Sequence, residues 1–314
     1  MSLKDIIASG GGWAPPRLVL YGDEKVGKTS TVAQAPNPLY LGTDDGRRRL
    51  GVDGLPIPST WDEFVGQLEQ AVEEAPGLGY GSLVTDTLNG IVELCAEHVC
   101  ATQFGGKWND TRHGFLAWGG NQGWGAVSEE IRRILPLYDQ VIDAGLWVIL
   151  IAHSSTQKVR NPIDGDYDRF APAMDRRVWA RVAQWADVIV RVDYDTTFLE
   201  DGGRRRAVTD GTRVLRCGAT IADSVGCRVG YELPETIPFA WQSIEDHLGK
   251  RTGEITGRLR ELWPLMTKDE MKKAVAFLGV DLEELDKAPL HKCKSLINRL
   301  AEKEAEATPE EVHA

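Results

Sequence analysis

The chain has 314 residues, 42% of them hydrophobic, and a formal net charge of −11 at neutral pH. This length allows one large domain with an appendage, or two domains. The acidity argues against a simple basic coat protein for nucleic acid, although it does not exclude a local basic groove. No run reaches the roughly 20 apolar residues of a membrane span, and the first residues lack the apolar core of a secretion signal. We therefore expect no membrane partner and a cytoplasmic location.

The segment YGDEKVGKTS, residues 21–30, contains the first informative motif. It has the pattern G-x-x-x-x-G-K-T, with the strand-like run RLVLY before it and the helix-like run STVAQA after it. The glycines let successive backbone N–H groups converge on a phosphate, and the N-terminus of the next helix faces the same charge. In such a loop Lys28 reaches the β- and γ-phosphates and the Thr29 hydroxyl holds Mg²⁺. The alternative is an ordinary strand-to-helix turn that happens to match the pattern.

We therefore predict a site for ATP and Mg²⁺ at this loop. Its cofactor-binding residues are expected to be Gly22, Asp23, Glu24, Lys25, Val26, Gly27, Lys28, Thr29 and Ser30.

The following segments alternate between strand and helix patterns. Strands are predicted at 39–41, 81–87, 146–154 and 187–194, and helices at 61–75, 127–145 and 178–186. The first of these helices is expected to be capped by Ser59 or Thr60, and Pro136 is expected to kink the second. Residues 197–217 resemble a hairpin that turns at 201–203. This order predicts an α/β fold with a mainly parallel sheet and helices on both faces.

Polar residues stand where the predicted strands end, which is the edge where ligands bind in parallel sheets. Asp86 ends the run SLVTD, and a carboxylate there would hold Mg²⁺ beside Thr29. The alternative for Asp86 is a cap on the next helix. Asp44 and Asp45 are both candidates for the catalytic base that orients the attacking water, against the alternative of a solvated acidic turn. His153 is expected either to contact the γ-phosphate or to have a structural role.

Two polar segments are predicted to be long loops. Residues 155–177 contain Lys158, Arg160 and Arg169 close to two aromatic residues, a combination that could follow a nucleic-acid backbone and stack on its bases. Residues 104–125 are rich in glycine and tryptophan and form the second such segment. For both segments the alternative is a partner-binding or simply ordered surface loop.

Taken together, these motifs resemble the RecA-like ATPases of the compact phage type, AAA-domain proteins that anneal single-stranded DNA. The resemblance rests on YGDEKVGKT, YLGTDDG, LVTDT and LIAHS, on the segment that ends in W-A-D, and on GCRVGYELPETIPFAW. It covers about residues 17–248 and makes Asp44 the counterpart of the family's catalytic base. It implies ATP and Mg²⁺ binding, DNA-stimulated hydrolysis, action on single-stranded DNA in recombination or annealing, and assembly into a ring or filament.

The chain departs from that family in two places. The base position holds Asp44 where glutamate is usual, which predicts slow hydrolysis or the use of Asp45 instead. The last motif keeps Arg228, which the resemblance assigns to the cofactor site, but lacks the lysine that usually precedes it. A phosphate-contacting cation is then missing or comes from elsewhere.

We expect two domains: residues 1–249 as a RecA-like core with an N-terminal extension (1–16), and residues 250–314 as a small helical domain with an acidic tail. The second domain could bind DNA, a neighbouring subunit of a homo-oligomer, or a single-strand-binding protein. Three functions stay open: an ATP-hydrolysing recombinase, a nucleotide-gated binder of single-stranded DNA or protein with negligible turnover, and an ATPase acting on a protein partner. If the protein is phage-encoded, its location is the host cytoplasm.

Overall fold

The computed structural model describes residues 14–162, 165–201, 204–228, 233–248, 250–287, 293, 296–297 and 299–300. Most of the expected N-terminal extension, the acidic tail (301–314), the hairpin turn at 202–203 and residues 229–232 of the last motif lie outside these residues. The chain forms two compact units. The larger contains Pro16–Ile142 and Leu146–His247. The smaller contains Asp143–Gly145 and the described parts of Met1–Pro15 and Leu248–Ala314.

The larger unit is built on a central sheet whose strand order is β11-β9-β6-β1-β4-β3-β2. Five neighbouring strands run parallel: β6 (Val188–Tyr194), β1 (Arg17–Gly22), β4 (Trp147–Val159), β3 (Ser82–Asp86) and β2 (Pro38–Leu41). Their segments are nearly continuous in apolar residues and are buried on both faces, as parallel strands between helix layers require. The predicted, mainly parallel α/β architecture is confirmed.

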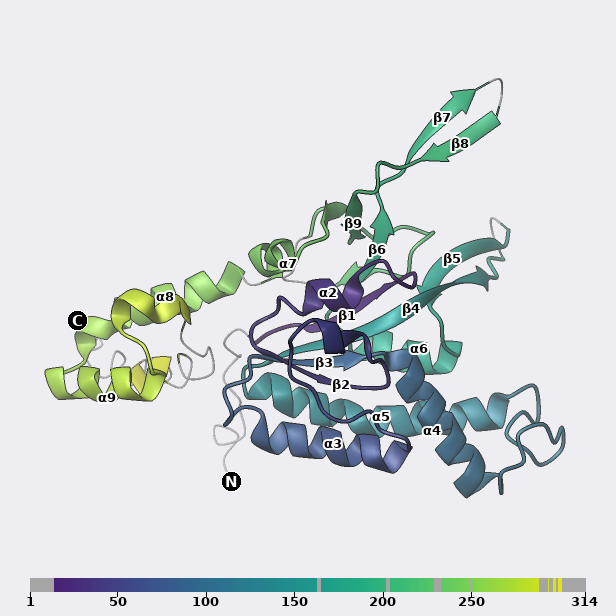
Figure 1. The fold of residues 1–314 in the computed structure, drawn as a ribbon, viewed down its shortest axis with the longest axis horizontal. Helices are drawn as coiled ribbons and strands as arrows, with labels where there is room; N and C mark the ends of the chain where they lie inside the picture. Colours follow the sequence, from purple (N-terminus) through teal and green to yellow (C-terminus); the bar gives the residue numbers. More distant parts are fainter. Residues whose placement is uncertain are drawn as a thin grey trace, which may run out of the picture. The chain divides into compact units, whose positions relative to one another are not determined.

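Antiparallel strands extend this sheet at one end and branch from it. The strands β9 (Arg213–Arg216) and β11 (Thr236–Pro238) continue the sheet beyond β6, and β10 (Gly226–Cys227) also pairs with β6. A separate two-stranded sheet is formed by β7 (Thr197–Asp201) and β8 (Arg204–Val208), which Figure 1 shows leaving the main sheet. The hairpin predicted from residues 197–217 is confirmed for β7 and β8, whereas β9, in the last part of that span, joins the main sheet instead.

Helices flank the parallel strands, and three of them gather along one side of the sheet in Figure 1: α3 (Trp61–Glu74), α4 (Leu88–Gln103) and α5 (Asn121–Asp143). The others in this unit are α2 (Lys28–Val32), α6 (Arg176–Trp185) and α7 (Trp241–Leu248), with a short 3₁₀ helix, η1 (Gly46–Arg49). Thr60 caps α3, as predicted, by accepting a hydrogen bond from the Glu63 N–H at 3.2 Å. The long α5 begins before the predicted residue 127 and runs through Pro136.

The prediction of a long irregular loop at 155–177 is wrong. β4 continues to Val159 and pairs with β5 (Tyr167–Pro172) as an antiparallel ribbon, in which Lys158 lies opposite Asp168. The side chains alternate between exposed and half-buried positions along both strands. This period-2 pattern is hidden in the sequence because the half-buried positions are themselves polar, among them Gln157 and Arg169.

The glycine- and tryptophan-rich segment at 104–125 is ordered by an aromatic cluster. The Phe115 side chain is fully buried and stacks on Trp108, with ring centroids 4.2 Å apart, while Phe104 and Trp124 meet it edge-on. Gly123 lies so close that an added Cβ would come within 2.5 Å of the Phe115 backbone oxygen. Aromatic packing thus replaces regular hydrogen bonding as the source of order before α5.

Replacing Phe115 with alanine should therefore lower the free energy of unfolding by about 3–5 kcal/mol, because it empties the centre of this cluster. Urea denaturation followed by tryptophan fluorescence measures the change. Trp118→Ala is the matched control, since that side chain is 73% exposed and should leave the stability nearly unchanged. Equal stability of Phe115→Ala and wild type would show that the cluster does not hold the segment.

The smaller unit is helical in its described part. It contains α8 (Lys250–Leu262), the 3₁₀ turn η2 (Trp263–Leu265), α9 (Lys268–Leu278) and η3 (Leu282–Lys287). The ends of α9 are encoded locally. Thr267 and Glu270 form a reciprocal capping box at its start, and Gly279 ends it in the left-handed conformation with φ 79°.

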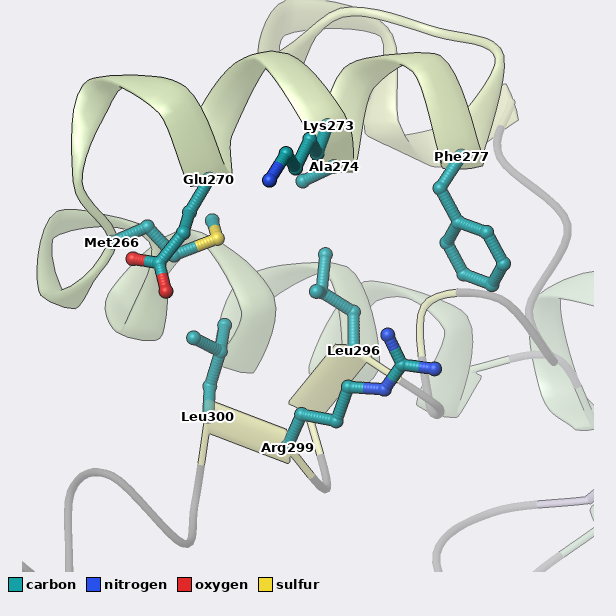
Figure 2. A pocket seen from close by; sticks show the side chains of 8 residues that line it. All are labelled: Met266, Glu270, Lys273, Ala274, Phe277, Leu296, Arg299 and Leu300. Atoms are coloured by element: carbon teal, nitrogen blue, oxygen red, sulfur yellow. The ribbon is translucent and has the colours of Figure 1, made fainter.

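A cavity of about 240 Å³ lies between α9 and the last described residues of the smaller unit. Figure 2 shows its side chains: Arg299, Leu296 and Leu300 project from one side, opposite Phe277 and Glu270 on α9. The Arg299 guanidinium lies 6.0 Å from the centre of the Phe277 ring, within reach of a cation–π contact. Among the described helices of the whole chain, none combines the length and apolarity needed to cross a bilayer.

Candidate functional site

The loop between β1 and α2 has the backbone conformation expected of a phosphate-binding turn. Gly27 precedes α2 with φ +94°, a left-handed conformation that glycine adopts without a steric cost. The Lys28 side chain is only 5% exposed, and its Nζ donates hydrogen bonds to the backbone oxygens of Gly22 (2.8 Å) and Asp23 (2.7 Å). Burial lowers the pKa of this amine, although four nearby carboxylates oppose the shift. The loop thus wraps around a cation that is aimed at its centre.

Thr29 and Asp86 meet beside that cation. The Thr29 hydroxyl donates to Asp86 Oδ2 at 2.7 Å, and Asp86 is only 3% exposed. Burial raises the pKa of Asp86 to about 6, and the hydrogen bond from Thr29 partly offsets the increase. Asp86 Oδ1 is buried and has no hydrogen-bond partner among the residues that the structure describes. A buried carboxylate oxygen that lacks a partner, next to a hydroxyl, suits a hard cation such as Mg²⁺.

Only one of the two acids after β2 faces this site. The Asp44 N–H donates to the Asp86 backbone oxygen at 2.9 Å, and its carboxylate accepts a hydrogen bond from the Gly46 N–H at 2.7 Å. Asp45 instead forms an ion pair with Arg48 at 2.6 Å at the start of η1. The sequence left these two acids as alternatives, and the structure brings Asp44 to the cavity.

His153 lies directly opposite Gly22 in the pairing of β4 with β1, at the edge of the phosphate loop. Its backbone N–H donates to Asn89 Oδ1 at 2.7 Å, and its ring Nδ1 is buried with no hydrogen-bond partner among the described residues. Burial and the Lys28 charge lower the pKa of His153, so the imidazole is neutral at neutral pH. A neutral ring with a free nitrogen can exchange a hydrogen bond with a phosphate or with water.

These elements enclose a cavity of about 300 Å³ at the carboxyl ends of β1, β2 and β3, beside His153 in the middle of β4. The residues that line it are Lys25, Gly27, Lys28, Thr29, Ser30, Asp44, Gly46, Asp86 and His153. The other predicted loop residues do not line the cavity. Asp23 accepts a hydrogen bond from Ser154 of β4, Glu24 is exposed, and Val26 is buried.

Arg228 does not join this site. Its guanidinium forms an ion pair at 3.1 Å with Asp187, the residue directly before β6, and donates to the backbone oxygens of Gln184 and Trp185. The phosphate loop lies at the other end of the parallel strands. The expectation that Arg228 contacts the cofactor is therefore wrong for a nucleotide held in its own chain, because the antiparallel β10 returns this residue to the amino end of the sheet.

The three predicted nucleic-acid residues lie on the ribbon of β4 and β5 but do not share one face. Lys158 is exposed and lies on the same face as Phe170, and Arg160 is exposed just beyond the end of β4. Arg169 occupies the opposite face, where it donates to the Tyr167 hydroxyl at 2.7 Å and the Ile221 backbone oxygen at 3.0 Å. Only Lys158 and Arg160 therefore remain open to a phosphate backbone.

Three residues around the site escaped the sequence reasoning. Asn89 holds the backbone of His153, and the Tyr40 hydroxyl donates to the Thr29 backbone oxygen at 3.0 Å. Arg213 of β9 donates to the Val26 backbone oxygen at 2.8 Å. Asn89 and Tyr40 lie close in sequence to the predicted strand ends, and this position could have identified them as site residues. Arg213 is 187 positions from its partner and has no such signal in the sequence.

Comparisons with known proteins agree with this geometry. A family model described as "AAA domain" matches residues 14–217, which include the phosphate loop, Asp44, Asp86 and His153. The chain is also 25% identical, over 211 residues, to the SPbeta prophage-derived uncharacterized protein YorG of Bacillus subtilis (strain 168). That alignment covers 66% of this chain and 56% of the relative, so the chain spans just over half the length of the curated relative that it matches. The family match extends over well more than half of the residues and contains a complete phosphate-loop site, and the chain therefore belongs to the AAA domain family of nucleotide-binding P-loop ATPases.

Proposed function

We propose that this protein is a RecA-like ATPase of phage type that hydrolyses ATP with Mg²⁺ and acts on single-stranded DNA in recombination or strand annealing. The observation that carries the ATP half is a pair of buried atoms without a hydrogen-bond partner among the described residues, Asp86 Oδ1 and His153 Nδ1, in residues that line the same cavity as Lys28. Buried polar atoms are costly unless they are paired. Both of these line the cavity of the phosphate loop, where a nucleotide and its cation would supply the missing partners.

Each residue then has a defined task. Lys28 binds the β- and γ-phosphates, while Thr29 and Asp86 would hold Mg²⁺, which supplies neutralisation of phosphate charge when it is bound. Asp44 orients the attacking water and accepts its proton, and the neutral His153 exchanges a hydrogen bond with the γ-phosphate. The buried setting strengthens these interactions, because little water competes for the same groups.

The DNA half of the proposal is supported by the path of β4. This one strand runs from His153 at the cavity into the ribbon that carries Lys158, five residues further along the same strand. A hydrogen bond gained or lost at His153 would therefore change the position or the stability of the ribbon formed by β4 and β5. The prophage-derived relative supports a phage origin. A location in the host cytoplasm is part of the same proposal. Assembly into a homo-oligomeric ring or filament, and contact with a single-strand-binding protein, belong to the same proposal through the sequence resemblance.

ATP hydrolysis with and without single-stranded DNA tests the proposal. We expect DNA to stimulate the wild-type rate and Asp44→Asn to lower the stimulated rate about a hundredfold, because the amide cannot accept the proton from water. Asp45→Asn is the matched control, since that neighbour faces Arg48 and should keep the rate. A wild-type rate that ignores DNA would contradict the DNA half, and an unchanged rate in Asp44→Asn would remove Asp44 as the base.

A second function is favoured by the state of Asp44. Its carboxylate is one methylene shorter than the usual glutamate and already accepts the Gly46 N–H. These features favour a nucleotide-gated binder of single-stranded DNA or of a protein, with negligible turnover. Retention of DNA on a filter separates the two functions: equal retention with ATP and with a slowly hydrolysed analogue, together with no measurable hydrolysis, supports the binder. Retention that decays as ATP is consumed supports the ATPase.

A further inference from the structure

A cation from a distant strand contacts the phosphate loop without being among the residues that line its cavity. Arg213, the first residue of β9, donates from Nη1 to the Val26 backbone oxygen at 2.8 Å. Its guanidinium lies 5.6 Å from the centre of the Phe239 ring, and the Phe239 N–H in turn donates to the Arg213 backbone oxygen at 3.2 Å. Among the residues that the structure describes, no carboxylate forms an ion pair with Arg213. Its described polar contact is thus with the loop.

Arg213 holds the peptide between Val26 and Gly27, and the orientation of this peptide determines whether its N–H can bind an anion in the loop. The Val26 oxygen and the Gly27 N–H belong to the same planar trans peptide and point in opposite directions. A donor that fixes this oxygen on the outside of the loop therefore fixes the Gly27 N–H toward the inside. Gly27 lines the cavity next to Lys28, so its N–H is available to a bound phosphate.

The absence of a side chain at Gly27 allows this arrangement. A Cβ added there would stand 2.2 Å from Arg213 Nη1 and 3.9 Å from the Phe239 ring. The loop backbone and the guanidinium are thus in direct contact at Gly27. The second glycine of the motif serves the left-handed turn and the close approach of Arg213 together.

We propose that Arg213 is a positioning residue of the nucleotide site: by holding the Val26 carbonyl outside the loop, it aims the Gly27 N–H at the phosphates inside. The inference rests on the proposed function, since it requires a phosphate in the loop. It assigns Arg213 to the phosphate end of the ligand, with no contact to the base. The ligand class for which it matters is any polyphosphate, with or without a nucleoside.

The test compares the binding of ATP, ADP and inorganic tripolyphosphate to the full-length chain by calorimetry. Arg213→Gln should weaken all three by about tenfold, the usual effect of losing one charge-assisted hydrogen bond. Arg213→Lys retains a charged donor and should recover part of the affinity. Arg216→Gln removes the other described arginine of β9, which pairs with Asp193 on β6, and should bind as wild type does. The melting temperature of each ligand-free variant shows that the fold is retained.

Two results would overturn this inference while leaving the proposed function intact. One is wild-type affinity in Arg213→Gln. The other is a loss confined to ATP and ADP, which would make Arg213 a contact to the base or the ribose. If Arg213→Gln melts well below wild type, its lost affinity could reflect a damaged fold, and Arg213→Lys is then the deciding variant. A stable Arg213→Lys that still binds as weakly as Arg213→Gln would contradict a positioning role. Failure of the wild type to bind any of the three ligands would refute the proposed function itself.

Discussion

Replacing Lys28 with alanine should lower ATP hydrolysis at least about a hundredfold, because one preorganised donor to the transferred phosphate is lost from a buried site. Lys28→Arg should fail as well. The ammonium of Lys28 is held between two backbone oxygens at 2.7–2.8 Å, and a planar guanidinium cannot occupy that position without displacing the loop. The measurement is steady-state hydrolysis at saturating Mg²⁺ and ATP, with Lys107→Ala as the control at an exposed lysine.

Thermal unfolding with and without MgATP completes the Lys28 experiment. A ligand at a hundred times its Kd stabilises the wild type by about 2.7 kcal/mol, and this gain should vanish in Lys28→Ala. A variant that keeps the gain but loses hydrolysis would show that Lys28 acts in the reaction and contributes little to binding. Hydrolysis at the wild-type rate would show that the nucleotide site lies elsewhere.

Asp86→Asn should abolish Mg²⁺-dependent hydrolysis and yet stabilise the metal-free protein at pH 8. Burial raises the pKa of Asp86 from 3.8 to about 6, so the charged form is less favourable in the folded chain than in the unfolded chain. A carboxyl whose pKa is raised by folding contributes its full stability below pH 4 and loses it as the pH rises through about 6. Asparagine does not ionise, so the variant keeps its stability as the pH rises. A shift of about two pKa units corresponds to about 2–3 kcal/mol in the free energy of unfolding.

Urea unfolding at pH 4 and pH 8 in the presence of a chelator measures this difference. The variant and the wild type should unfold alike at pH 4, and the variant should be the more stable at pH 8. Asp45→Asn, at an exposed ion pair, should change stability by less than about 1 kcal/mol at either pH. A less stable Asp86→Asn at pH 8 would contradict the account, because it would mean that the carboxylate is favourable even without a cation.

The parts of the site that could be predicted from the sequence are the strand ends. Asp86 and His153 each follow a short apolar run, and the loop that carries Lys28 begins where another such run ends. Parallel strands bring the residues after these runs to one edge of the sheet regardless of the distance along the chain. The choice between Asp44 and Asp45 could not be made, because adjacent residues differ only in direction. That direction is set by the hydrogen bond of the Asp44 N–H to the Asp86 backbone and by the pairing of Asp45 with Arg48.

The failures arise from antiparallel additions to the parallel sheet. β5 has polar residues on both faces, so its alternation is hidden in the sequence, which therefore predicts a loop at residues 155–177. The family resemblance assigns Arg228 to the cofactor site by its place in a motif, but β10 runs antiparallel to β6 and returns this residue to the amino end of β6. Arg213 came to the phosphate loop through the same antiparallel extension. Local patterns predict where a strand is, whereas its direction and neighbours depend on tertiary packing.

The unusual length of β4 gives this strand two different stabilities. Its first half, Trp147–Ala152, is fully buried between two parallel neighbours, and its backbone amides can exchange with solvent only when the core opens. Its second half, from Ser154 onward, pairs only with β5 among the described strands and is partly exposed, so those amides should open locally at a much lower free energy. The cavity lies at His153, where one regime changes into the other. A nucleotide bound there would contact β4 at the boundary between the segment that opens only with the core and the segment that opens locally. A small binding free energy at that boundary could change how often the ribbon of β4 and β5 opens.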